Sequence, residues 1–268
     1  MNLSEIPVAI LCGGKGTRLR EETEFRPKPM IRIGSKPILW HIMKHFAHYG
    51  VRNFMLCLGY KGELIREYFL NYDTYNSDIL VELGTKSIQK LRETHDEKDW
   101  RVSLIDTGQN TATGGRLKIL TPYIQNKYPF FFATYGDGVG NINIDALAEF
   151  HLKQGKLATV TAVRPPSRFG ELSIENDLAK HFHEKSQTYE GWINGGFLVL
   201  DRKVLDLIDD EDTALELSPM RALAAQGQLA VYRHEGFWQC MDTHREMELL
   251  NDLDEIGEAP WKVWINDR

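Results

Sequence analysis

The chain has 268 residues, of which 42% are hydrophobic and 26% are charged, a composition typical of a globular protein with a substantial core. Its formal net charge of -6 argues against nucleic acid as a partner, and no apolar run is long enough to span a bilayer. The first residues lack the pattern of a signal peptide, and the three cysteines (Cys12, Cys57 and Cys240) show no CxxC spacing. We therefore expect a cytoplasmic protein whose partners are neither nucleic acid nor membrane.

Apolar strand-like runs alternate with segments of helical period from residue 8 to about residue 163. Strands are predicted at residues 8–12, 53–59, 101–106, 130–137 and 157–163. Helices are predicted from Pro37 to just before Gly50 and at residues 62–72, 116–126 and 143–154. This alternation predicts an α/β fold, with a Rossmann-like, mostly parallel sheet flanked by helices on both faces.

After about residue 165 the pattern changes to shorter pieces such as GELSI, AKHFHEK, GGFLVL and LAVYRHE. We interpret these as antiparallel additions to one side of the sheet, followed by helices near 203–209, 216–226 and 243–256. No repeat or linker divides the chain. We therefore expect a single domain over 1–268, with a core at 1–164 and a smaller elaboration at 165–268.

The stretch LCGGKGTRL (residues 11–19) places three glycines and two cations directly after a predicted strand. Such a loop brings backbone N–H groups and positive charge close to a phosphate, although a plain tight turn also fits the loop alone. The chain has no GxxxxGK[ST] sequence, and Leu19 stands where a dinucleotide-binding loop needs its third glycine. The loop is therefore a phosphate-binding loop of another kind or a plain tight turn.

A second cation follows in FRPKPM, where Lys28 lies between Pro27 and Pro29. Proline restricts its own backbone and that of the residue before it, so we expect Lys28 on a stiff, extended segment. Taken alone, this could be a surface lysine in a proline-rich turn. Its position shortly after the glycine loop favours a phosphate contact.

His41, His45 and His48 fall on roughly one face of a predicted helix. An i, i+4 histidine pair can bind zinc, but the HExxH glutamate is absent and no third ligand type lies nearby. We interpret these histidines as packing residues.

Several segments together resemble the sugar-1-phosphate nucleotidylyltransferases. The loop GGKGTRL, RPKPM and GSKPILWHIM match the nucleotide-binding signature of that family. The segments DTGQNTATGGRLK, TYGDGV, RPPSRFGEL, WINGGF and GFWQCMDT resemble its glucose-1-phosphate cytidylyltransferase branch. The similarity runs from about residue 7 to residue 264. It implies a nucleotidyltransferase (GT-A-like) fold in which the elaboration after residue 164 binds the sugar.

The resemblance implies an enzyme that joins CTP to α-D-glucose 1-phosphate, giving CDP-glucose and pyrophosphate. This is a first step towards CDP-linked deoxysugars of cell-surface polysaccharide such as lipopolysaccharide O-antigen. The family also suggests a homo-oligomer such as a hexamer. Transfer between two polyanions needs cations and alignment rather than a protein nucleophile.

Catalytic roles carry over to Arg18, Lys28, Asp137 and Asp242, and the two aspartates are implied to hold one Mg²⁺. Each aspartate also has a structural alternative, Asp137 as a turn residue before Gly138 and Asp242 as a helix N-cap. The implied nucleotide contacts are Leu11, Cys12, Gly13, Gly14, Lys15, Gly16, Thr17, Arg18, Lys28, Thr111, Arg116 and Gly136.

The implied sugar-phosphate contacts are Glu184, Lys185, Asn194 and Gly195. Ser186 replaces the proline that usually follows this lysine in the family, which puts the placement of Lys185 in question. Two alternatives stay open: a relative that uses another nucleotide or another phosphorylated acceptor, and a catalytically silent subunit that senses nucleotides. The retained cations and carboxylates disfavour the second.

Overall fold

The computed structural model describes residues 1–124, 128–165, 171–175, 178–183 and 191–265. Its centre is a mixed sheet in the order β13-β10-β14-β8-β1-β4-β7, with β15 on the other edge of β10. The strands are β1 (Pro7–Leu11), β4 (Asn53–Leu58), β7 (Arg101–Asp106), β8 (Phe131–Tyr135), β10 (Ala158–Val163), β13 (Ile193–Asn194), β14 (Leu198–Leu200) and β15 (Leu229–His234). Strands β8, β1, β4 and β7 run parallel, which confirms the predicted core.

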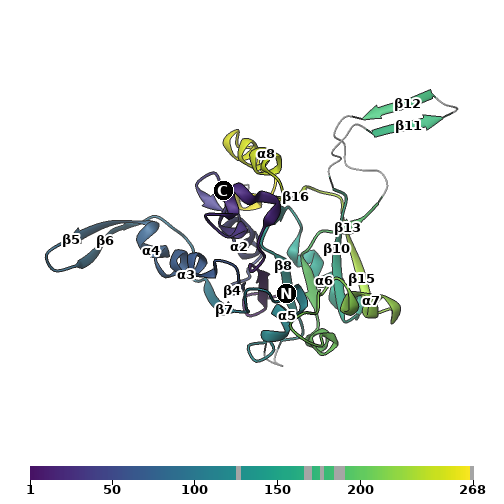
Figure 1. The fold of residues 1–268 in the computed structure, drawn as a ribbon, viewed down its shortest axis with the longest axis horizontal. Coiled ribbons are helices and arrows are strands. Elements are labelled where there is room, and N and C mark those ends of the chain that lie inside the picture. The colour runs from purple at the N-terminus through teal and green to yellow at the C-terminus, as the bar shows by residue number, and fades with distance from the viewer. Residues whose placement is uncertain (125–127, 166–170, 176–177, 184–190, 266–268) are drawn as a thin grey trace.

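Alternate residues of β1 enter different apolar clusters, because successive side chains of a strand point to opposite faces. Val8 and Ile10 join one cluster, and Ala9 joins the other. Helices α2 (Ile38–His48), α6 (Ile144–Gln154) and α8 (His244–Glu255) contribute buried residues to the first cluster. Helices α5 (Thr113–Ile119) and α7 (Ser218–Ala225) contribute to the second. Both faces of the sheet are therefore covered, as predicted (Figure 1).

The later strands depart from the expected antiparallel arrangement in one respect. Strands β13 and β14 pair with β10 antiparallel, but β15 pairs with β10 in parallel, from Ala158↔Leu229 to Val163↔His234. Sequence pattern does not encode strand direction. Since β14 runs antiparallel to β10, the chain reverses its direction between β14 and β15, which makes β15 parallel to β10.

Helix α5 begins and ends earlier than predicted, at Thr113–Ile119 instead of 116–126. Its first turn holds Gly114 and Gly115, and a Cβ on either would lie within 2.5 Å of backbone oxygens of Thr213 and Glu211. These glycines are needed because another backbone segment packs directly on the helix. Pro122 follows shortly after the helix and prevents its extension.

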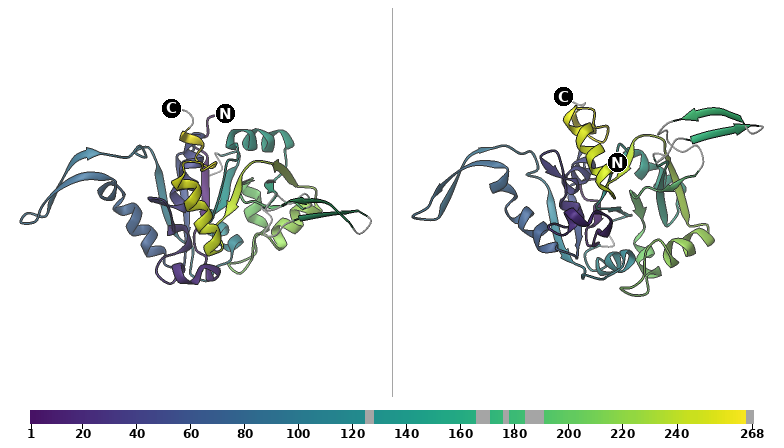
Figure 2. Two further views of the ribbon diagram at one scale, coloured as in Figure 1. Left: turned by 90° about the horizontal axis from the view of Figure 1, so that it is seen from above. Right: turned by 45° about the horizontal axis from the view of Figure 1, so that its top comes forward.

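Two hairpins extend from opposite ends of the body (Figures 1 and 2). One consists of β5 (Ser77–Glu82) and β6 (Ser87–Glu93), and the other of β11 (Glu171–Glu175) and β12 (Leu178–His183). The first hairpin was not predicted. Its strands carry exposed apolar residues such as Leu80, Ile88 and Leu91, so the alternation between core and solvent that reveals a strand is missing.

The remaining elements are short. They are the strands β2 (Arg32–Ile33), β3 (Lys36–Pro37), β9 (Gly138–Gly140) and β16 (Trp238–Cys240), the helices α1 (Arg20–Thr23), α3 (Gly62–Leu70) and α4 (Tyr72–Tyr75), and the 3-10 turns Thr17–Leu19, Lys28–Met30, Arg202–Leu207 and Val263–Ile265. Within the described part of the chain, no helix is long and apolar enough to cross a membrane.

Two of the three histidines of α2, His41 and His45, are packing residues, as interpreted from the sequence, and His48 is half-buried. His41 and His45 are each 2% exposed, and their Nε2 atoms lie 3.0 Å from the Ile33 carbonyl oxygen and 2.8 Å from that of Ile142. Burial lowers the pKa of both rings to about 4, so both are neutral at pH 7. Across the described ranges, no three histidine, cysteine or acidic residues gather in a way that could hold a metal ion.

Candidate active site

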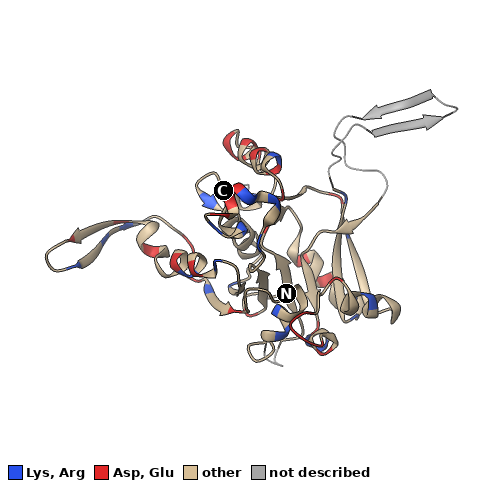
Figure 3. Ribbon diagram, viewed as in Figure 1, with Lys and Arg blue, Asp and Glu red and all other residues tan. Residues whose placement is uncertain are grey.

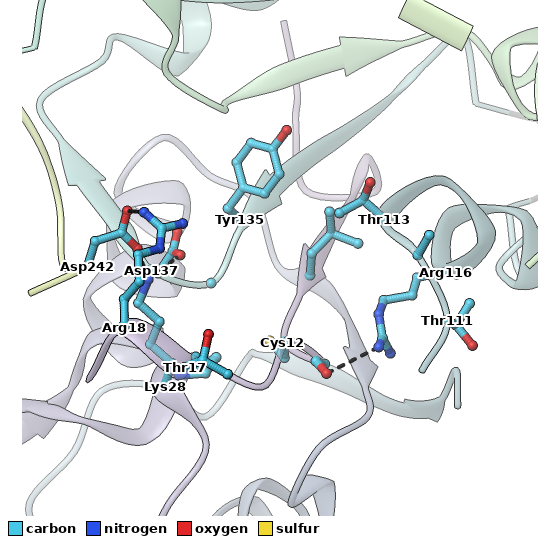
Figure 4. Close-up of a pocket in the computed structure, with 17 residues that line it drawn as sticks. Cys12, Thr17, Arg18, Lys28, Thr111, Thr113, Arg116, Tyr135, Asp137 and Asp242 are labelled. Atoms are coloured by element: carbon cyan, nitrogen blue, oxygen red, sulfur yellow. Dashed lines mark hydrogen bonds and ion pairs between the residues drawn. The ribbon is translucent and has the colours of Figure 1, made fainter. Parts of the chain in front are cut away.

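The glycine loop after β1 forms one wall of a cavity of about 340 Å³ at the carboxyl ends of the parallel strands (Figure 4). Ligands of open α/β sheets bind at this edge. Of the residues assigned to nucleotide and catalysis from the sequence, the lining includes Leu11, Cys12, Gly13, Gly14, Gly16, Thr17, Arg18, Lys28, Thr111, Arg116, Gly136, Asp137 and Asp242. Lys15 is not among the described residues that line it. The tertiary structure thus gathers into one cavity residues that span most of the chain.

Arg116 lies buried at the base of this cavity and holds its walls together. Its Nη1 donates to the carbonyl oxygen of Leu58 at 3.0 Å and to Oγ1 of Thr107 at 2.8 Å, and its Nη2 donates to the carbonyl oxygen of Gly13 at 3.1 Å. One guanidinium therefore ties the glycine loop to the ends of β4 and β7, and Figure 4 shows its contact with the loop. A Cβ on Gly13 would lie 2.0 Å from Nη1, which explains why the loop has glycine there.

Lys28 lies between the two carboxylates at the mouth of the cavity. Its Nζ donates to Oδ2 of Asp137 at 2.7 Å and to Oδ1 of Asp242, while Arg18 pairs with the other oxygen of Asp242. Lys28 is only 8% exposed, so it is not the surface residue that its proline-rich segment also allowed. It begins a 3-10 turn, and the extended conformation belongs to Pro27. Burial alone lowers the pKa of Lys28, but the two carboxylates outweigh it and raise that pKa.

The two aspartates meet because of a short strand pair. Strand β9 pairs antiparallel with β16, with Cys240 opposite Gly138, and the N–H of Met241 donates to the carbonyl oxygen of Asp137 at 2.8 Å. The alternative role of Asp242 as an N-cap is wrong. Thr243 caps α8 and forms a capping box with Glu246, which leaves the Asp242 carboxylate to face the cavity.

The two aspartates could supply two ligands to a divalent cation, and the remaining ligands would have to come from elsewhere. Both carboxylates reach the same atom, Nζ of Lys28, so an ion in that region could contact both. Oxygen is the ligand that hard divalent cations prefer, and two protein carboxylates are a usual number when substrate phosphates supply further ligands. The arrangement fits an ion shared with a phosphorylated substrate.

A second, larger cavity of about 1110 Å³ adjoins the first and shares Arg18, Tyr135, Asp137 and Asp242 with it. Its lining includes Asn194 from the predicted sugar site. Gly195 is held beside it, since its carbonyl oxygen accepts a hydrogen bond from Trp238 Nε1 at 2.8 Å. The other two predicted contacts, Glu184 and Lys185, lie outside the described residues.

The second cavity is lined by charges of both signs. The wall formed by α8 includes Arg245 beside Glu246, Glu248 and Asp252, and acidic residues are prominent along this helix in Figure 3. At the opening shared with the first cavity, Arg18 lies with Asp137 and Asp242. A ligand that carries both a phosphate and hydroxyl groups fits this mixture, because cations attract phosphates and carboxylates accept hydrogen bonds from hydroxyls.

Sequence reasoning did not single out Tyr135, Trp238 and Glu216, of which the first two line these cavities. Tyr135 lines both, and Trp238 lines the second. Both stand in the segments TYGDGV and GFWQCMDT, so the signal was present but was assigned only to the aspartates. Glu216 lines neither cavity and carries no motif, yet its carboxylate accepts hydrogen bonds from Tyr135 and Thr113.

Comparison with known proteins identifies the family. Residues 8–248 match the family model described as nucleotidyl transferase. The chain is 48% identical over 257 residues to the glucose-1-phosphate cytidylyltransferase of Salmonella typhi, covering 95% of this chain and 98% of that protein. The chain belongs to the nucleotidyl transferase family. The resemblance found in the sequence is thereby confirmed.

Two further comparisons bear on the branch and on the fold. A probable glucose-1-phosphate cytidylyltransferase of Bacillus subtilis is 45% identical over 256 residues, with 95% of this chain and 98% of that protein covered. The crystal structure of HddC from Yersinia pseudotuberculosis superposes with a TM-score of 0.68 at 22% identity, covering 92% of this chain and 98% of that one. This second likeness supports the fold alone, and the predicted nucleotidyltransferase fold is confirmed.

Proposed function

We propose that this protein transfers a cytidylyl group from CTP to α-D-glucose 1-phosphate, giving CDP-glucose and pyrophosphate. The observation that carries the proposal is the identity of 45–48% to glucose-1-phosphate cytidylyltransferases over nearly the whole of both chains. The two adjoining cavities support it, since one lies against a glycine loop and the other combines a cation with hydroxyl-accepting groups. They share the side chains that would face the reacting phosphates.

In the proposed reaction, an oxygen of the sugar phosphate attacks the α-phosphorus of CTP in line. A new P–O bond forms as the bond from the α-phosphorus to the bridging oxygen breaks, and pyrophosphate leaves with the electron pair. No protein nucleophile is needed, and the residues between the cavities accordingly include cations and carboxylates. Arg18 and Lys28 neutralise the phosphates, and the glycine loop places backbone N–H groups against them.

Asp137 and Asp242 would hold Mg²⁺. When bound, this ion supplies positive charge to the phosphate oxygens and fixes their geometry. Lys28 occupies the space between the carboxylates in this structure. Its ammonium group is therefore placed to turn from the aspartates to a phosphate oxygen once their charge is met by another cation.

The hexose is assigned to the second cavity. Asn194, the last residue of β13, lines this cavity, and Gly195, Lys185 and Glu184 remain predicted contacts of the sugar phosphate. We also propose that the chain acts as a single domain, in the cytoplasm and as a homo-oligomer. The free thiols of Cys12, Cys57 and Cys240 agree with a reducing compartment.

A pyrophosphate-release assay tests the proposed function by crossing the four common nucleoside triphosphates with glucose, galactose and mannose 1-phosphates in the presence of Mg²⁺. We expect CTP with glucose 1-phosphate to give the highest kcat/KM. Preference for UTP or dTTP would assign the chain to another branch, and inactivity with every pair would return it to a nucleotide-sensing role.

A second assay tests the shared metal site. Asp137→Asn, Asp242→Asn and the double variant should show similarly low turnover, because residues that act as one unit give non-additive losses. Rate losses that multiply in the double variant would mean that the two aspartates act separately.

A further inference from the structure

Glu216, which precedes α7, connects the two cavities without lining either. Its Oε2 accepts a hydrogen bond from Thr113 Oγ1 at 2.6 Å, and its Oε1 accepts one from the Tyr135 hydroxyl at 2.6 Å. Thr113 lines the first cavity, and Tyr135 lines both. A single carboxylate is therefore bonded to side chains on both sides of the proposed reaction centre.

The chain of hydrogen bonds continues into the second cavity. Tyr135 has one hydroxyl proton, which it donates to Glu216, so its oxygen is left to accept from Nδ2 of Asn194 at 3.1 Å. The amide orientation of Asn194 is fixed as well, because its Oδ1 accepts from the N–H of Gly196 at 2.9 Å. Each donor and acceptor from Glu216 to Asn194 is thereby assigned.

The Glu216 side chain determines the direction of this chain of hydrogen bonds. A carboxylate only accepts hydrogen bonds, so the phenol must donate to it. Burial and the adjacent Glu216 both raise the pKa of Tyr135, which keeps the phenol protonated. Figure 4 shows the Tyr135 hydroxyl pointing away from Asp137 and Asp242, so this tyrosine is not a further ligand of the proposed metal site.

We propose that Glu216 is a positioning residue that acts through Tyr135 to fix the hydrogen-bonding groups that Asn194 presents to the sugar phosphate. Asn194 retains one Nδ2–H and one Oδ1 lone pair beyond its two internal bonds. Asn194 is exposed in the free protein, and a bound sugar would cover it. A site with a fixed pattern of donors and acceptors then rejects a sugar whose hydroxyls do not match, because the mismatch leaves the covered polar groups unpaired. Glu216 thus contributes to the choice of hexose. This inference rests on the proposed function.

Loss of the carboxylate should affect the sugar side more than the nucleotide side. Thr113 is held independently of Glu216, since its Oγ1 accepts from the N–H of Leu215 at 3.0 Å and neighbouring backbone groups bond to Glu211 and Thr213. For the Tyr135 proton, Glu216 is the one acceptor recorded among the described residues. Without it the phenol can rotate, and Asn194 loses its fixed orientation.

The test measures kcat and KM for CTP and for glucose, galactose and mannose 1-phosphates in wild type, Glu216→Leu, Glu216→Gln and Tyr135→Phe. We expect Glu216→Leu to raise the KM for glucose 1-phosphate about tenfold, the usual effect of losing one hydrogen bond to a charged group. The KM for CTP should change less, and the preference for glucose over the other hexoses should fall. Glu216→Gln keeps one acceptor oxygen and should be intermediate.

A double variant determines whether Glu216 acts through Tyr135. Glu216→Leu combined with Tyr135→Phe should be no worse than Tyr135→Phe alone, because the second change already breaks the connection. Glu211→Gln, on the same segment and exposed, is the matched control for loss of charge and should behave as wild type.

Three outcomes would overturn the inference. They are unchanged hexose preference in both Glu216 variants, additive losses in the double variant, or a fall in melting temperature with no change in KM, which would indicate a structural role. If Glu216→Leu does not fold, the KM values and hexose preferences of Glu216→Gln and Tyr135→Phe still decide whether Glu216 acts as a positioning residue. Failure of the proposed function is distinguishable, since it would appear as wild type that does not use glucose 1-phosphate.

Discussion

Replacing Lys28 by Met removes an ammonium group that two carboxylates share while keeping the length and most of the volume of the side chain. In the free protein, Asp242 would then keep its contact with Arg18, but the carboxylates of Asp137 and Asp242 would lack the ammonium group that they share. Their side chains are 32% and 15% exposed, so solvent screens part of the repulsion. Breaking a fully buried pair costs about 3–5 kcal/mol, and with this screening we expect about 1–3 kcal/mol.

A loss of that size lowers the melting temperature of a chain of this length by roughly 2–8 °C. Mg²⁺ should reverse the loss, because a divalent cation between the aspartates replaces the missing ammonium group, and a ligand that binds only the folded state stabilises it. In wild type, Lys28 competes with the ion for the same oxygens. The shift caused by millimolar Mg²⁺ should therefore be larger in Lys28→Met than in wild type.

Thermal unfolding with and without Mg²⁺ measures both effects, and turnover measures a third. Turnover of Lys28→Met should fall by about a hundredfold or more, the usual cost of losing a preorganised contact to transition-state charge. Lys203→Met, which replaces an exposed lysine outside both cavities, should match wild type in all three measurements. If Lys28→Met melts at the wild-type temperature and gains nothing extra from Mg²⁺, the aspartates do not depend on Lys28 and do not share one ion.

Two further predictions follow from packing and burial. Gly13→Ala should destabilise the fold by about 1–3 kcal/mol, because its Cβ would collide with the Arg116 guanidinium. The Cβ of Gly14→Ala meets nothing within 4 Å, so this control should keep wild-type stability while raising the KM for CTP. Equal melting temperatures of the two variants would contradict this reasoning. Burial lowers the pKa of His41 and His45 to about 4, below the value near 6.5 in the unfolded chain. The resulting stabilisation of the fold is therefore complete above pH 6.5 and is lost as the pH falls towards 4. The loss is on the order of 3 kcal/mol for each ring, measurable as a lower urea midpoint at pH 5 than at pH 7, and His45→Gln should flatten this dependence.

Sequence alone was sufficient for the parallel core and for the glycine loop that lines the first cavity. The buried strand at 8–12 and the helix after Pro37 differ from β1 and α2 by one or two residues at each end, because apolar periodicity directly reflects burial on a sheet face or a helix stripe. The loop from Leu11 to Arg18 was recognisable because its glycines and cations are consecutive. Motif resemblance also selected Asp137 and Asp242, although each had a structural alternative.

Only the tertiary structure decided how distant segments combine. The direction of β15 follows from its pairing with β10 and is opposite to that of β14, and the β5–β6 hairpin lacks the apolar alternation that a half-buried strand shows. Glu216 bonds to Thr113 and Tyr135, which are 103 and 81 residues away, and a glutamate before a helix carries no local sign of such contacts. The same holds for Lys28, which the sequence allowed at the surface and the fold buries between two carboxylates. Periodicity and motifs report a residue's own surroundings, whereas these contacts arise only when the sheet brings its loop ends together.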